Sequence, residues 1–342
     1  MRGIQPWDKE ISIVAKTPVK YEFNPQNESF ESWQRRSKRK LKQLIGFDRL
    51  EKCELDFIEE YVKEYDDFFE IRFTFQSEID YYVPCVMRIP KKSEFKKPPV
   101  MICLQGHGTG MHVSLGIKKY DIDRDKADNG DRDFAVQCIE KGYCAVALEQ
   151  RNFGERGGNP RPQCHEPSMT ALLTGRTAVA CRVWDIMRLI DTLKEFYSNK
   201  IDCKRIYCMG NSGGGTTTIY AAALDKRIKG AIPSCSFCTF LSSISEKHHC
   251  TCNYIPSIRN YFDMAEIAAL IAPRPLVIVN GQEDGIFPVK PATDEFNRLR
   301  DNYYAYSSEP DNVKHVVGPE GHRFYKNPSW DVFEALIKNK GM

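Results

Sequence analysis

The residues of this chain that could do chemistry begin with a serine set among glycines. Ser212 stands in the stretch Met209-Gly210-Asn211-Ser212-Gly213-Gly214-Gly215, which fits the pattern G-x-S-x-G. The apolar run 205–209 before it predicts a strand, and the segment 216–224 after it predicts a helix. A turn that leads directly from a strand to a helix is sharp and exposes the serine hydroxyl. The residues beside the serine must then have almost no side chain, to avoid clashes. We therefore expect a nucleophile elbow rather than a flexible loop, provided that partner residues follow.

An acid and a histidine farther along the chain could activate this serine. The apolar strand expected over 275–280 leads to Asp284, and a short final strand over 313–317 leads to His322. We expect His322 to be the general base for Ser212, and the Asp284 carboxylate to hold the imidazole in the correct tautomer. Glu283 is the neighbouring acid, and only the G-x-x-D spacing from Gly281 favours Asp284 over it.

A glycine-rich turn follows the first strand of the expected parallel sheet. The buried-strand pattern 100–104 is followed by Gln105-Gly106-His107-Gly108-Thr109-Gly110. The backbone N–H groups of His107 and Gly213 are our candidates for an oxyanion hole. A phosphate-binding loop is the alternative, but neither the Walker lysine spacing nor a complete G-x-G-x-x-G is present.

Two charged residues follow another expected strand, over 144–148. Glu149 and Arg151 stand at its carboxyl end, the edge at which open α/β sheets bind ligands. They could contact substrate or orient loops, and an ion-paired structural turn is the alternative that we favour over direct catalysis.

The segment His248-His249-Cys250-Thr251-Cys252 has the residue types that bind zinc. Four ligands crowded into five positions diverge too much to surround one tetrahedral ion, so we expect no metal site and no cofactor, and a loop that lines the substrate cavity.

The elements expected around these residues indicate an α/β fold. From residue 98 onward short apolar strands alternate with helices, which predicts a mostly parallel central sheet flanked by helices. Residues 1–97 should form an N-terminal helix over 29–45 and a hairpin of strands 68–76 and 79–89, packed on a core domain of residues 98–342. Within the core we expect a loop over 157–169, one helix over 173–196 and a cap-like insertion over 234–262 that covers the pocket.

Composition limits the function classes. The 49 basic and 46 acidic residues give a net charge of +3, so nucleic acid and membranes are not expected as main partners. The basic face of the 29–45 helix is interpreted as solvated. No apolar run is long enough to span a bilayer, and residues 1–8 lack the apolar core of a signal peptide. Thirteen scattered cysteines suit reduced thiols, so a cytoplasmic protein is expected. The oligomeric state is left open.

The whole set of motifs resembles the α/β-hydrolases, and more narrowly the bacterial acetyl-xylan-esterase-like and dienelactone-hydrolase-like esterases related to the catalytic domain of prolyl oligopeptidase. The likeness covers most of the chain and rests on Gly106-His107-Gly108, Arg151-Asn152-Phe153-Gly154, Gly210-Asn211-Ser212-Gly213-Gly214, Ile271-Ala272-Pro273-Arg274-Pro275, residues 281–288 and Gly321-His322. It implies a serine esterase with Ser212, Asp284 and His322 as its triad and a small acyl ester of a carbohydrate or other small alcohol as its substrate.

Two other activities stay open on the same residues. A peptidase of oligopeptidase type would need a filter domain, for which residues 1–97 are too few. A hydrolase or lyase that cleaves carbon–carbon bonds would use the same triad geometry, and only substrate tests separate it from an esterase.

Overall fold

The computed structural model describes residues 5–157, 161 and 163–338, and its centre is one nine-stranded sheet with the order β1-β2-β3-β5-β4-β6-β7-β8-β9. The six strands from β5 to β9 run parallel, whereas β1, β2 and β3 pair antiparallel at one end. The strands are β1 Ile58–Glu64, β2 Phe68–Glu78, β3 Tyr81–Pro90, β4 Pro99–Leu104, β5 Cys144–Leu148, β6 Asp202–Asn211, β7 Ile228–Ser234, β8 Leu276–Gly281 and β9 Val313–Gly318. This topology confirms the expected α/β class with a mostly parallel sheet.

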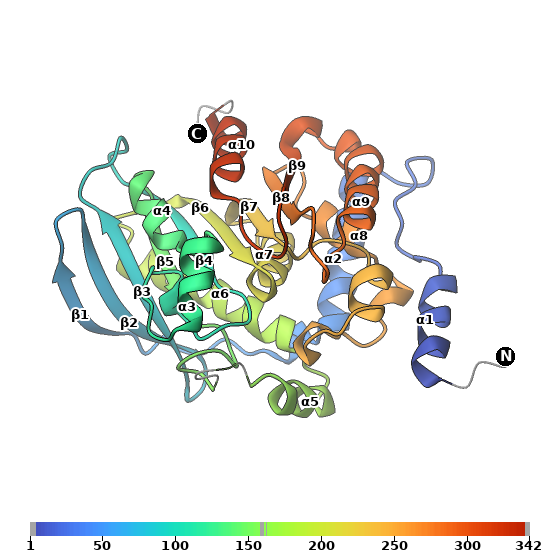
Figure 1. Ribbon diagram of the computed structural model, residues 1–342, viewed down its shortest axis with the longest axis horizontal. Coiled ribbons are helices and arrows are strands. Elements are labelled where there is room, and N and C mark those ends of the chain that lie inside the picture. The colour runs from blue at the N-terminus through green and yellow to red at the C-terminus, as the bar shows by residue number, and fades with distance from the viewer. Residues whose placement is uncertain (1–4, 158–160, 162, 339–342) are drawn as a thin grey trace.

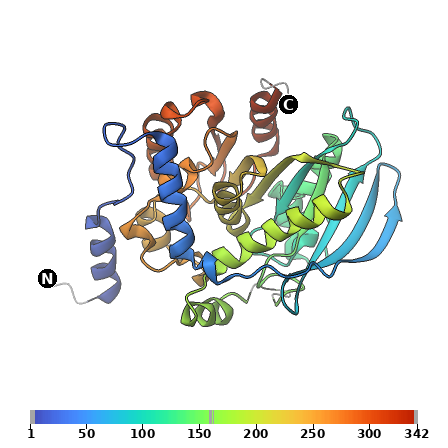
Figure 2. The same cartoon turned by 180° about the vertical axis from the view of Figure 1, so that it is seen from behind.

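Helices cover both faces of the sheet. Figure 1 shows α4 and α10 over one face, and Figure 2 shows α2 and α6 over the other. The longer helices are α1 Pro6–Lys16, α2 Phe30–Ile45, α4 Phe134–Glu140, α5 His165–Leu173, α6 Ala178–Phe196, α7 Gly213–Leu224, α8 Met264–Ala269, α9 Val289–Asn302 and α10 Lys326–Lys338. Both faces of the central strands are therefore apolar, and β4 sends Val100 and Ile102 into one core and Met101 and Cys103 into the other.

The N-terminal region continues the sheet. The expected hairpin forms as β2 and β3, and β3 pairs with β5 from Cys85–Leu148 to Arg88–Ala145. The expected helix forms as α2, where Ser29 caps the first turn and Gly46 ends the helix in the left-handed region. Its Trp33 is fully buried. Helix α1 and strand β1 were not predicted, because α1 has no buried residue and β1 has only one position that is even partly buried.

The single helix expected over 173–196 was wrong. The chain breaks between α5 and α6, where Gly175 has a φ of +72° and the Thr177 hydroxyl accepts a hydrogen bond from the N–H of Ala180. The expected loop over 157–169 is correspondingly shorter, since α5 begins at His165; residues 158–160 and 162 lie outside the described residues. A left-handed glycine followed by an N-cap threonine stops one helix and starts the next.

The expected cap has little regular structure. Its short helical turns are η4 Leu241–Ser245, η5 Thr251–Asn253 and η6 Ile258–Asn260. Among the described helices, none has both the length and the apolar character needed to cross a bilayer.

Candidate active site

Ser212 occupies the strained turn that its sequence predicted. It lies between the end of β6 and the start of α7, with φ 56° and ψ −122°, a conformation that a residue with a side chain rarely adopts. The flanking glycines are required by packing, because a Cβ on Gly210 would stand 2.6 Å from the carbonyl oxygen of Gly214. A Cβ on Gly214 would overlap the carbonyl oxygen of Leu104 in β4. The turn is thus held by close backbone contacts with the neighbouring strand.

This packing predicts a large stability cost for one added methyl group. Gly214→Ala should lower the free energy of unfolding by about 3 kcal/mol, because the backbone of β4 cannot move away as a flexible side chain would. Gly285→Ala is the matched control, since nothing lies within 4 Å of a Cβ at that position. Urea unfolding of both variants checks the prediction, and equal midpoints would show that the elbow is not tightly packed.

His322 and Asp284 form a direct hydrogen bond. Their loops follow β9 and β8, neighbouring parallel strands, and His322 Nδ1 lies 2.8 Å from Asp284 Oδ2. The second carboxylate oxygen of Asp284 accepts the N–H groups of Ile286 at 2.8 Å and Phe287 at 3.0 Å. Burial opposes the ionisation of Asp284, but the bond and charge of His322 and these two N–H groups lower its pKa below the ordinary value. An ionised Asp284 keeps the proton of His322 on Nδ1 and leaves Nε2 free to accept another.

Strand β7 links the elbow to the histidine loop. The carbonyl of Ser234, the last residue of β7, accepts the N–H of Ser212 at 2.8 Å. The hydroxyl of the same Ser234 donates to the carbonyl of Arg323 at 3.2 Å. Ser212 and the residue after His322 are therefore bonded to one residue at the carboxyl edge of the sheet. The structure brings all three predicted triad residues to this edge.

The glycine-rich loop after β4 lies against the elbow. A Cβ on Gly106 would stand 2.9 Å from the Cβ of Ser212, and a Cβ on Gly213 would stand 2.8 Å from Nδ1 of His107. The two predicted oxyanion donors, the N–H groups of His107 and Gly213, thus belong to segments in contact with Ser212.

Glu149 holds this loop in place. It is almost fully buried at the end of β5, and its carboxylate accepts a hydrogen bond from Gln105 Nε2 at 2.7 Å. It also accepts the N–H of Met111 at 3.0 Å and, more weakly, that of Glu155 at 3.4 Å. Glu149 touches both ends of the 105–111 loop, which favours the loop-orienting role over direct contact with substrate.

Burial raises the pKa of Glu149 to about 7, from an ordinary value of 4.5. Because the folded-state pKa is raised, the contribution of this group to stability is complete below about pH 4.5 and is lost as the pH rises through 7. Ionising the buried carboxylate should cost about 3 kcal/mol by about pH 8. Unfolding free energies measured from about pH 5 to about pH 8 should fall in the wild type and fall less in Glu149→Gln; parallel profiles would contradict the prediction.

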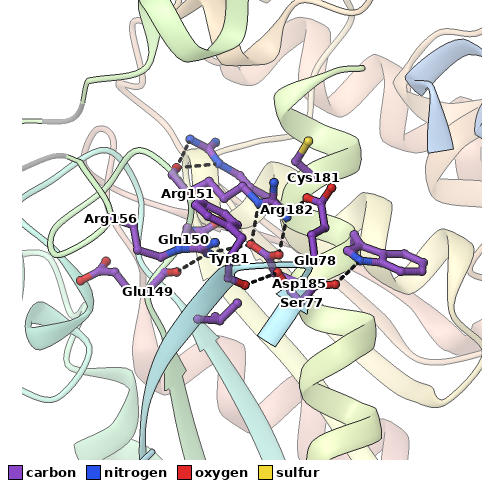
Figure 3. A network of polar contacts seen from close by, with 12 residues as sticks. Ser77, Glu78, Tyr81, Glu149, Gln150, Arg151, Arg156, Cys181, Arg182 and Asp185 are labelled. Carbon is purple, nitrogen blue, oxygen red and sulfur yellow. Dashed lines mark hydrogen bonds and ion pairs between the residues drawn. The ribbon is translucent and has the colours of Figure 1, made fainter. Parts of the chain in front are cut away.

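Arg151 belongs to a buried ion network rather than to the elbow. Its guanidinium donates to both carboxylate oxygens of Asp185 in α6, at 2.9 and 2.7 Å, and Arg156 donates to the same carboxylate at 2.7 Å (Figure 3). Arg151 also pairs with Glu78 at 2.6 Å, and its guanidinium lies over the ring of Tyr81. This is the ion-paired structural turn that sequence reasoning favoured. Its acid, Asp185, was missed because an acid inside a helical pattern gives no signal of its partner.

The histidines and cysteines at 248–252 do not act as one group. His248 is exposed, and His249 bonds through Nε2 to the Ser243 hydroxyl at 2.9 Å. Cys250 and Cys252 instead gather with His107 and with Cys164 at the start of α5. Residues 248–252 alone cannot surround one ion, but two candidate ligands, His107 and Cys164, come from other segments.

Comparisons with known proteins find hydrolases and esterases that are similar to this chain. A family model described as a glucuronyl esterase of fungi matches residues 173–239, the segment that contains Ser212. Over 192 residues the chain is 27% identical to the protein named "Putative hydrolase YtaP" of Bacillus subtilis, an alignment that covers 55% of this chain and only 62% of that relative.

Solved structures match over nearly the whole chain. A crystal structure from Bacteroides fragilis, described as a putative acetyl xylan esterase, superposes with a TM-score of 0.75 at 19% identity, and covers 96% of this chain and 84% of that one. A glucuronoyl esterase of Solibacter usitatus superposes with a TM-score of 0.66 at 16% identity, over 95% and 99% of the two chains. The sheet order, the elbow and these neighbours agree, and the chain has the α/β-hydrolase fold.

Proposed function

We propose that this protein is a serine esterase that removes a small acyl group, such as acetyl, from a carbohydrate or another small alcohol. The observation that carries the proposal is the 2.8 Å bond between His322 and Asp284 at the sheet edge that also holds the strained Ser212. A buried carboxylate, an oriented imidazole and the hydroxyl of a half-buried serine are the parts that two-step acyl transfer needs.

Each residue has one role in the proposed reaction. His322 Nε2 takes the proton of Ser212 as its oxygen attacks the ester carbonyl, and Asp284 stabilises the imidazolium. The N–H groups of Gly213 and His107 bind the oxyanion, each worth about 3 kcal/mol or roughly a hundredfold in rate. His322 returns the proton to the leaving alcohol, and water repeats the attack on the acyl-enzyme.

A small apolar cavity beside the elbow favours the proposal that the acyl group is short. Thr216 lines this cavity, and its N–H donates to the carbonyl of Ser212 at 2.8 Å. Phe240, Ile244 and Phe287 line the cavity, and the ring centroid of Phe287 lies 6.1 Å from that of His322. Bulky side chains on the cap leave room for few carbon atoms, which favours acetyl over long acyl chains.

The names of the similar proteins suggest which alcohol and which acid form the substrate ester. The acetyl xylan esterase neighbour supports an acylated carbohydrate as substrate. The match to a glucuronyl esterase model over the elbow favours a second candidate, in which the sugar is a uronic acid and supplies the acyl side of the ester. Both candidates use the same triad.

An ester panel tests the proposal. Acetate, butyrate and octanoate esters of 4-nitrophenol should be cleaved in that order of kcat/KM, and an acetylated xylo-oligosaccharide should be deacetylated. A methyl ester of glucuronic acid tests the second candidate, and a peptide ester and a 1,3-diketone test the peptidase and carbon–carbon alternatives. Cleavage of the diketone without turnover of any ester would overturn the esterase proposal.

A reducing compartment such as the cytoplasm is part of the proposal. All thirteen cysteines are free, and ten of them are buried, as expected of packed thiols rather than of a disulfide framework.

A further inference from the structure

A cluster of one imidazole and three thiols lies next to the elbow. His107 comes from the loop after β4, Cys164 from the start of α5, and Cys250 and Cys252 from the cap around η5. Each contributes one ligand atom, and these four atoms all lie within 4.8 Å of one another. His107 Nε2 is 3.2 Å from Cys252 Sγ and 3.8 Å from Cys164 Sγ.

We propose that these four side chains bind a structural zinc ion. One imidazole and three thiolates form a ligand set typical of closed, tetrahedral zinc sites. Ligands at the usual Zn–S and Zn–N distances stand about 3.6–3.8 Å apart around a tetrahedral ion. The separation of His107 and Cys164 is 3.8 Å, and that of His107 and Cys252 is shorter, at 3.2 Å. Thiolates select zinc over magnesium or calcium, which prefer oxygen ligands.

The surroundings of the cluster match the charge of such a site. Three thiolates and one Zn²⁺ carry a net charge of −1, and the buried Arg182 of α6 points two guanidinium nitrogens at the sulfurs. Nη1 lies 3.4 Å from Cys252 Sγ, and Nη2 lies 3.5 Å from Cys164 Sγ. Its other contacts are the carbonyl of Arg151 and the ring of Phe153. Among residues 5–157, 161 and 163–338, no carboxylate forms an ion pair with Arg182.

A buried guanidinium without a carboxylate partner needs another anion. The zinc–thiolate complex would be that anion, and N–H···S bonds from Arg182 would orient its ligands, as outer groups do in metal sites. Two of the ligands are enclosed: Cys164 is 4% exposed and Cys252 1%, and Phe153 and Ala178 pack beside them, whereas His107 and Cys250 are half-buried. With four protein ligands the ion has no open position for substrate, so it acts as a cross-link and not as a Lewis acid.

The cross-link would serve the active site through His107. It joins the irregular cap and α5 to the loop whose His107 N–H is the proposed oxyanion donor. The cap has no long helix or strand of its own between Ser234 and Phe262, so the ion replaces the packing that regular elements would supply. The zinc is inferred from the four ligands and from Arg182, and it does not depend on the ester chemistry.

Metal content of the full chain, purified with a reductant and without chelator, tests the proposal. We expect roughly one zinc per chain by mass spectrometry of the metal, and the same content in Ser212→Ala. Cys164→Ser and Cys250→Ser should lose most of the zinc. Cys203→Ser is the matched control and should keep it, since Cys203 lies at the start of β6 and its thiol donates to the carbonyl of Leu193.

Cobalt substitution keeps the test independent of whether the variants fold. Wild-type protein reloaded with Co²⁺ should show thiolate charge-transfer bands and the intense visible bands of a tetrahedral site, and Cys203→Ser should show the same. A wild type that holds no zinc as purified, and that binds added Zn²⁺ more weakly than micromolar, would overturn the proposal. A disulfide among Cys164, Cys250 and Cys252, seen as the loss of two thiols under reducing purification, would overturn it as well.

Discussion

Ser212→Ala is expected to lower kcat on a short acyl ester by about 10⁴-fold or more, which corresponds to roughly 5.5 kcal/mol of lost transition-state stabilisation. In the proposed reaction the oxygen of this hydroxyl forms the acyl-enzyme, and alanine offers no nucleophile in its place. The fold should survive, because alanine fits the same space. A residual rate above that in water should remain, because the oxyanion donors are unchanged.

Two controls sharpen this experiment. Ser37→Ala removes another buried serine hydroxyl, which lies in α2 and has no hydrogen-bond partner among the residues that the structure describes, and should leave kcat unchanged. The double variant Ser212→Ala with His322→Ala should be no slower than Ser212→Ala alone, since residues that act as a unit do not contribute additively. A Ser212→Ala protein that keeps more than about a tenth of wild-type kcat would remove Ser212 from the mechanism.

Asp284→Asn should also lower kcat by about 10⁴-fold, with little change in KM. The amide can present an N–H to His322, and this stabilises the wrong tautomer of the imidazole. Asparagine fills the same volume and can still accept the N–H groups of Ile286 and Phe287 through its oxygen, so the loop should keep its shape. The loss should therefore appear in kcat and not in the unfolding midpoint.

Glu283→Gln is the matched control for Asp284→Asn. Glu283 is the adjacent acid that the sequence separated poorly from Asp284; its side chain is exposed, and its N–H bonds to the carbonyl of Glu320. Its substitution should leave kcat within about twofold of wild type. If Glu283→Gln were the inactive variant, the assignment of the acid would be reversed.

The parallel core could be predicted because its signals are local. Strands β4 to β9 each contain a short apolar run, and the elbow with its glycines indicates a backbone turn within seven residues. The segments that the sequence missed have no such pattern. Strand β1 is exposed along nearly its whole length and is held by pairing with β2, and the break before α6 depends on Gly175 and Thr177 inside an otherwise helical pattern.

Candidate residues for the triad followed from the sequence, since a serine, an acid and a histidine each came just after an expected parallel strand, and the carboxyl ends of parallel strands share one edge. Their spacing along the chain made them candidates, and the fold then placed His322 beside Asp284.

The sequence could not show the gathering of His107 with Cys164 and Cys252. His107 and Cys252 stand 145 positions apart, and nothing in the residues around either one indicates the other. The same holds for Arg182, which reaches the sulfurs from α6, and for Asp185, which pairs with Arg151 from that helix. Local backbone structure depends on neighbouring residues and can be predicted from them. Contacts between distant segments depend instead on how the cap, α5 and α6 pack together, and only the folded chain shows that packing.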